Sequence, residues 1–86
     1  MTNAEKLEEL KKESSIKLKI HSNYVADLAR FISQKIPVTK EQFKEQDKKL
    51  SAYHSVANEY TFLLEYINKK KLRFDGEYKV PDHYTL

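Results

Sequence analysis

The chain of 86 residues is 34 % charged and 40 % hydrophobic and has a formal net charge of +3. This composition is typical of one small folded domain and excludes a disordered chain. Because the sequence has no cysteine and a single glycine, disulfides, thiol chemistry and glycine-rich phosphate loops are excluded. No segment has the length of a membrane span or the apolar core of a signal peptide, so we expect a cytoplasmic protein of a bacterial host.

The first predicted element is a helix over about residues 3–35. Thr2, followed three residues later by Glu5, matches a capping box, in which each side chain bonds the other residue's backbone N–H. Residues 16–20 alternate as in a strand, but the helical period continues through them. The predicted inner face of this helix comprises Leu7, Leu10, Ser14, Leu18, His21, Val25, Leu28 and Ile32.

A turn at residues 36–39 and a second helix at about 40–70 follow. Pro37 disfavours a helical conformation of the residue before it, and Thr39 with Gln42 forms a second capping box. The predicted inner face of this helix comprises Phe43, Gln46, Leu50, Tyr53, Ala57, Tyr60, Leu64 and Ile67.

The short turn makes the two helices antiparallel neighbours, an all-α helical hairpin with coiled-coil-like packing. The predicted layers are Ile32 with Phe43, Leu28 with Gln46, Val25 with Leu50, His21 with Tyr53, Leu18 with Ala57, Ser14 with Tyr60, Leu10 with Leu64, and Leu7 with Ile67. In two layers we expect hydrogen bonds between helices, from His21 to the Tyr53 hydroxyl and from Ser14 to the Tyr60 hydroxyl.

A C-terminal tail, residues 72–86, completes this single domain of residues 1–86. Gly76 follows Asp75 and is expected to adopt a left-handed turn conformation that reverses the chain. We therefore expect the tail to fold back on one end of the hairpin and to cover residues 58–67, where apolar side chains surround the helix. Its own apolar residues are Leu72, Phe74, Tyr78, Val80, Tyr84 and Leu86.

Apolar residues outside the predicted inner face indicate an association surface. A contiguous apolar ridge left uncovered on a small domain usually marks a binding site, and tyrosine is enriched at binding hot spots. The residues expected to bind a partner are Ile16, Ile20, Tyr24, Phe31, Tyr66 and Tyr84. The partner is expected to be another protein or a second copy, which would complete a four-helix bundle.

Neither catalytic nor metal-binding spacing is present. His21, His54 and His83 are scattered, and no histidine or carboxylate set matches a zinc or calcium site, so we predict no cofactor, metal or catalytic residue. The one basic cluster, whose first role is to complement the negative end of the second helix, is the alternative nucleic-acid site. It consists of Lys69, Lys70, Lys71 and Arg73.

Residues 43–53, FKEQDKKLSAY, resemble the second-helix motif of the helical-hairpin aspartyl-phosphate phosphatases of sporulation in one spacing. Asp47 is followed six positions later by Tyr53. Phe43 stands where that motif has serine, and Gln46 stands where it has leucine, so the chain is not assigned to the family.

The sequence thus predicts a non-enzymatic protein-binding accessory, regulatory or inhibitory protein. Its bias toward Lys, Asn, Tyr and Ile is typical of AT-rich genomes and suggests a phage- or plasmid-encoded origin. The alternative is a nucleic-acid-binding accessory protein that uses the basic cluster, and a small helical-hairpin phosphatase is the third hypothesis.

Overall fold

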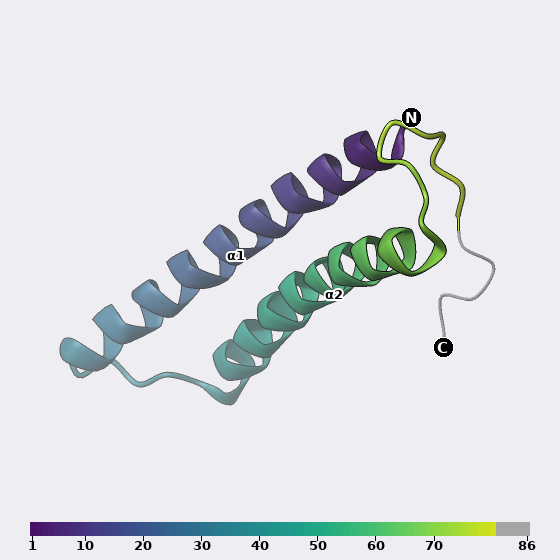
Figure 1. The fold of residues 1–86 in the computed structure, drawn as a ribbon. Helices are drawn as coiled ribbons and strands as arrows, with labels where there is room; N and C mark the ends of the chain where they lie inside the picture. The colour runs from purple at the N-terminus through teal and green to yellow at the C-terminus, as the bar shows by residue number, and fades with distance from the viewer. Residues whose placement is uncertain (81–86) are drawn as a thin grey trace.

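The computed structural model describes residues 1–80 and contains two long antiparallel helices joined by a short turn (Figure 1). Helix α1 spans Asn3–Ser33 and helix α2 spans Lys40–Lys70, each with 31 residues. The two pack against each other in a molecule that measures 54 × 22 × 17 Å. The described residues contain no strand, only an isolated bridge between Thr2 and Glu77. The predicted all-α hairpin is confirmed.

Both helices begin with the predicted capping boxes. The Glu5 amide donates to the Thr2 hydroxyl at 3.1 Å, and the Thr2 amide donates to the Glu5 carboxylate at 2.9 Å. The corresponding distances for Thr39 and Gln42 are 3.2 and 2.8 Å. Each box satisfies two of the amides that a helix start leaves without a helical partner.

Each helix is followed closely by a lysine in the left-handed conformation. Lys35 has a φ of 58° and Lys71 a φ of 54°, whereas Gly76 does not have a positive φ, so the prediction for this glycine is wrong. Just beyond Lys35, the Ile36 amide donates to the Phe31 carbonyl at 2.8 Å, which is the long bond of a Schellman motif. This bond pairs a helix-end carbonyl and ends α1 two residues before the predicted boundary.

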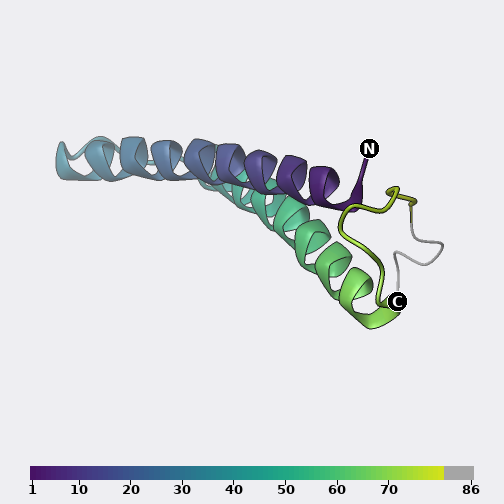
Figure 2. The same cartoon turned by 45° about the horizontal axis from the view of Figure 1, so that its top comes forward.

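The main cluster of buried residues lies at the end of the hairpin away from the turn, and Leu28, at 5 % exposure, is buried nearer the turn. Leu63 and Ile67 are each 1 % exposed, and they pack with Leu7 and Leu10 of α1. The half-buried side chains packed against this cluster are Val56, Tyr60, Leu64 and Tyr78. Figure 2 shows the two helices spreading apart at this end, where residues 71–80 run across between them.

In about half of the layers in the seam between the helices, the residue that faces the other helix is the one immediately before the predicted residue. The half-buried residues there are Lys17, Tyr24 and Phe31 of α1 and Gln42, Lys49 and Val56 of α2. The predicted seam residues Leu18, Ile32 and Phe43 are instead 43 %, 62 % and 49 % exposed, so their assignment to the core is wrong. The Lys49 ammonium lies 5.0 Å from the centre of the Tyr24 ring, which shows that Tyr24 faces α2.

The hydrogen bonds predicted for the two polar layers are wrong. The His21 Nε2 atom is buried and has no hydrogen-bond partner among the described residues. The Ser14 hydroxyl donates to the Lys11 carbonyl of its own helix at 2.9 Å rather than to Tyr60. Tyr53, the expected partner of His21, packs its ring against the next residue, His54, at 5.3 Å.

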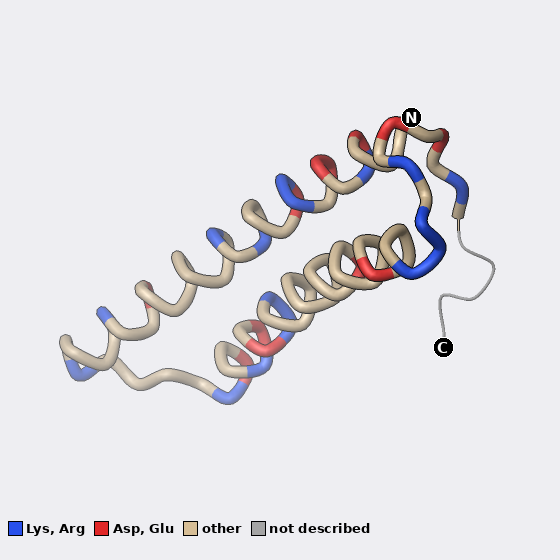
Figure 3. Tube along the Cα trace, viewed as in Figure 1, with Lys and Arg blue, Asp and Glu red and all other residues tan. Residues whose placement is uncertain are grey.

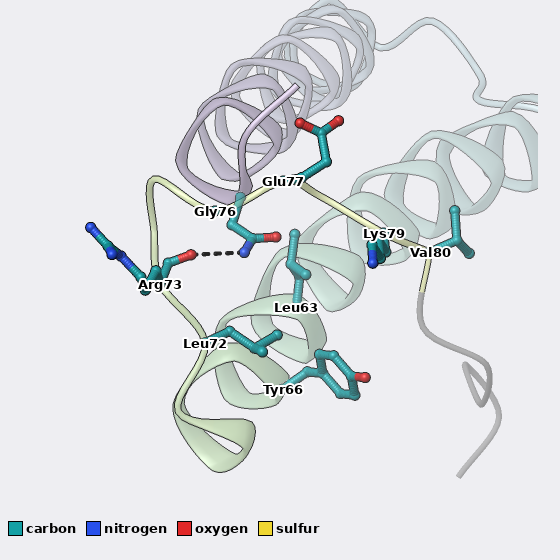
Figure 4. Close-up of a pocket in the computed structure, with 9 residues that line it drawn as sticks. Leu63, Tyr66, Leu72, Arg73, Gly76, Glu77, Lys79 and Val80 are labelled. Atoms are coloured by element: carbon teal, nitrogen blue, oxygen red, sulfur yellow. Dashed lines mark hydrogen bonds between the residues drawn. The ribbon is translucent and has the colours of Figure 1, made fainter.

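Residues 73–78 lie across the start of α1. The backbone amides of Asn3 and Ala4 donate to the Gly76 and Phe74 carbonyls at 2.9 and 2.8 Å. The buried Asn3 side chain donates to the Arg73 carbonyl at 2.8 Å, the bond dashed in Figure 4. The remainder of the predicted tail, residues 81–86, lies outside the described residues.

Candidate protein-binding surface

The two long sides of the hairpin differ in the residues that flank the seam. Successive helix residues are about 100° apart, so the residue after each seam position points to one flank of its helix. In an antiparallel pair, these two flanks lie on the same side. The residues there are Leu18, Val25 and Ile32 of α1 and Phe43, Leu50 and Ala57 of α2, and we call them the uncharged side.

The uncharged side is apolar and largely uncovered between the middle of the hairpin and the turn. Ile32, Phe43 and Leu18 are each about half exposed, and Val25 and Leu50 are half-buried between them. On this side of α1 the next outer positions hold Ser22 and Ala29, so no charged side chain interrupts it between Lys11 and the end of the helix. On α2 the charges on this side are Lys40 and Asp47, both at the outer margin.

The opposite side, which we call the charged side, contains an open pocket of about 240 Å³. It is lined by Lys17, Ile20, Glu45, Lys48, Lys49 and Ala52. The Lys49 ammonium donates to the Glu45 carboxylate at 2.8 Å. This hydrogen bond, together with the charge of the ammonium, lowers the pKa of Glu45. Three ammonium groups and one carboxylate therefore surround this pocket.

The structure does not bring the described residues of the predicted association ridge onto one surface. Ile16 and Ile20 are 60 % and 44 % exposed, and Ile20 lies on the charged side. Tyr24 and Phe31 are half-buried in the seam. Tyr66 stacks against Phe62 of its own helix with the ring centres 6.4 Å apart, and Tyr84 lies outside the described residues.

Charged residues gather in the first half of each helix and in the segment after α2 (Figure 3). Lys69, Lys70 and Lys71 are exposed where α2 ends. Arg73 donates from both its Nε and one terminal nitrogen to the two oxygens of Asp75, each at 2.9 Å. Of the four residues in the basic cluster, three lysines are therefore accessible to an acidic partner, while the arginine charge is compensated within the chain.

A larger pocket, of about 460 Å³, lies between the tail and the two helices (Figure 4). It is lined by Asn3, Leu63, Tyr66, Leu72, Arg73, Gly76, Glu77, Lys79 and Val80. Because the chain continues from Val80 into residues outside the described range, we assign no ligand to this pocket.

The described residues present no further chemical site. Within residues 1–80, no group of three or more histidines, aspartates or glutamates is placed to hold a metal ion. Neither α1 nor α2 has an apolar stretch long enough to cross a membrane. Asp47, the aspartate of the phosphatase-like spacing, is exposed and has no hydrogen-bond partner in the described part of the chain.

Comparison with known proteins finds no matching family model, no similar curated protein and no similar solved structure.

Proposed function

We propose that this is a non-enzymatic binding protein, with an accessory, regulatory or inhibitory role, whose uncharged side binds a protein partner, either a foreign protein or a second copy. The supporting observation is the exposure of Ile32, Phe43 and Leu18 on one uncharged side of a small domain. Contiguous exposed apolar surface of this kind marks interaction sites, because water contact with it is unfavourable. Covering the exposed half of each of these three side chains contributes about 1 kcal/mol.

The shape of the uncharged side favours a protein over a small molecule as its partner. Small-molecule sites are concave and carry a few polar groups that fix the ligand's orientation. The uncharged side consists of side chains from two adjacent helices, a surface of ridges and grooves suited to another helix. Binding by surface complementarity, which blocks or recruits the partner, is the mode of action this surface supports.

Two single substitutions test the proposal in an extract of the organism that encodes the chain. Ile32→Glu places a charge on the uncharged side, and Ile16→Glu places one on an equally exposed position away from it, since the two isoleucines are 62 % and 60 % exposed. We expect a protein that is captured by the parent and by Ile16→Glu to be lost with Ile32→Glu. Identical captured sets for all three chains, measured by mass spectrometry, would contradict a role for this side.

A second candidate, nucleic-acid binding, is favoured by the three consecutive exposed lysines Lys69, Lys70 and Lys71. Phosphate contacts by lysine release counterions, so such binding weakens steeply with salt. Replacement of the three lysines by glutamate should abolish any salt-sensitive shift of DNA or RNA while leaving the protein captured through the uncharged side unchanged. Absence of a shift with the parent chain at low salt would exclude this candidate.

A further inference from the structure

We infer that the uncharged side binds a second copy of this chain, so that two hairpins form a four-helix bundle related by a two-fold axis. This inference rests on the proposed function, because it names the occupant of the same surface. Three observations support a second copy: the pattern of apolar positions, the distribution of charge on the two sides, and the size of the surface.

The pattern of apolar positions is that of a helix with two neighbours. A two-stranded coiled coil needs apolar residues at only two positions of each heptad, whereas a bundle helix carries a third apolar position beside them. In α1 this additional apolar position is occupied by Leu18, Val25 and Ile32, which are spaced seven residues apart. The same position holds Phe43 and Leu50 in α2. Both helices therefore present an apolar flank that their hairpin partner leaves uncovered.

The charge distribution selects which side meets its own copy. A two-fold axis places the same surface patch of each copy against the other. On the charged side this would bring together the pockets of the two copies, each surrounded by Lys17, Lys48 and Lys49 with Glu45 as its single carboxylate. The uncharged side contains no such cluster, and its marginal charges, Lys11, Lys40 and Asp47, remain at the rim where water solvates them.

The size of the uncharged side matches the lower end of the range for a stable pair. From Leu18 to the turn it extends about 25 Å along the helix, at a rise of about 1.5 Å per residue. Two packed helices, each about 10–12 Å in diameter with side chains, are together about 22 Å across. The projected area is therefore roughly 550 Å², and side-chain relief raises the accessible area toward the ~600–800 Å² per partner of a specific interface.

The test is the mass of the purified full chain in solution, by sedimentation equilibrium over a range of micromolar concentrations. We expect the parent and Ile16→Glu to sediment at twice the chain mass of 10.2 kDa. Ile32→Glu should raise the dissociation constant at least about 100-fold, because each copy would bury an unpaired carboxylate. Circular dichroism checks that each variant remains helical, and Ile32→Ser replaces Ile32→Glu if the latter does not fold.

The outcomes separate this inference from the proposed function. A parent chain that is monomeric at every concentration overturns the second copy as occupant. A monomeric parent that co-sediments with phosphatidylglycerol vesicles also overturns the second copy as occupant, because a lipid surface is then the partner. In either case the capture experiment still decides whether another protein uses this side. A parent that is dimeric and remains so in Ile32→Glu overturns the inference in another way, because the interface then lies elsewhere.

Discussion

The two ends of the hairpin have similar apolar content, but the tail end buries more of it, because Leu28 is the one hydrophobic residue among the described residues that is buried outside the tail-end cluster. At the tail end Leu63 and Ile67 are each 1 % exposed, whereas at the turn end Ile32, Ile36 and Phe43 are between 44 % and 62 % exposed. The difference is a third segment, because Tyr78 packs against the core cluster only at the tail end. Each helix of the hairpin covers only one face of the other helix. A third segment, here the tail, is needed to bury the apolar residues that remain exposed.

The two helix starts show the same difference in their backbone hydrogen bonds. Both have a complete capping box, but at α1 the amides of Asn3 and Ala4 also donate to carbonyls in residues 74–76. The equivalent amides of Lys40 and Glu41 at the start of α2 donate to no group in the described chain. The tail thus completes the hydrogen bonding of one helix start, while solvent does so at the other.

The largest expected effect is on the free energy of unfolding, which a truncation at the tail end should lower more than a truncation at the turn end. Ile67→Ala removes a fully buried side chain from the closed cluster and should lower the free energy of unfolding by about 2–5 kcal/mol. Ile32→Ala, at a position 62 % exposed, should cost less than about 1 kcal/mol in dilute, monomeric protein. Urea unfolding followed by circular dichroism measures both. Equal losses would mean that the turn end is as well packed as the tail end.

A smaller effect is expected in the hydrogen exchange of the two helix starts. The Asn3 and Ala4 amides should exchange at least about tenfold more slowly than those of Lys40 and Glu41, because exchange there requires residues 73–78 to detach. Asn3→Ala removes the side-chain bond to the Arg73 carbonyl and should lower this protection and cost about 1–2 kcal/mol. Asn23→Ala, at an exposed position of the same helix, is the matched control. Equal exchange at both starts would show that the tail does not hold α1.

The hairpin could be predicted from local sequence signals. The rotation of each helix about its own axis, which decides the residues that face the other helix, was predicted wrongly. The boxes at Thr2 and Thr39 depend on neighbouring residues alone, so the helix starts follow directly from the sequence. Rotation about the helix axis depends on choosing between two adjacent stripes, such as Lys17 and Leu18, that both recur every three or four residues. The structure places the stem of Lys17 in the seam and leaves Leu18 outside, a choice that no local signal indicates.

This rotation also explains why the candidate surface could not be predicted in full. Leu18, Ile32 and Phe43 were assigned to the core by spacing, and their exposure on one side appears only once the seam is known. The reason for glycine at position 76 also differs from the predicted one. A Cβ atom there would lie 3.1 Å from the Arg73 carbonyl oxygen, so the close approach of the backbone within this turn, rather than a positive φ, favours glycine.

The smallest expected effect arises from the one residue type that differs between the two capping boxes. The α1 box uses Glu5, which ionises, and the α2 box uses Gln42, which does not. The hydrogen bond from the Thr2 backbone, followed by that from its hydroxyl, lowers the pKa of Glu5 below its ordinary value of 4.5. A pKa lowered by folding stabilises the protein above the unfolded-state value, and this contribution is lost as the pH falls through the folded-state value.

We therefore expect the melting temperatures of the parent and Glu5→Gln to converge as the pH falls through the pKa of Glu5. All other carboxylates titrate in both proteins, so their effects cancel in the difference, and an NMR titration of the Glu5 carboxyl carbon gives the pKa itself. Gln42→Glu, the reciprocal change, should introduce the same dependence at the turn end, because its carboxylate would accept the Thr39 amide in the same geometry. A difference between parent and Glu5→Gln that stays constant from neutral to acid pH would show that the Glu5 carboxylate does not hold the start of α1.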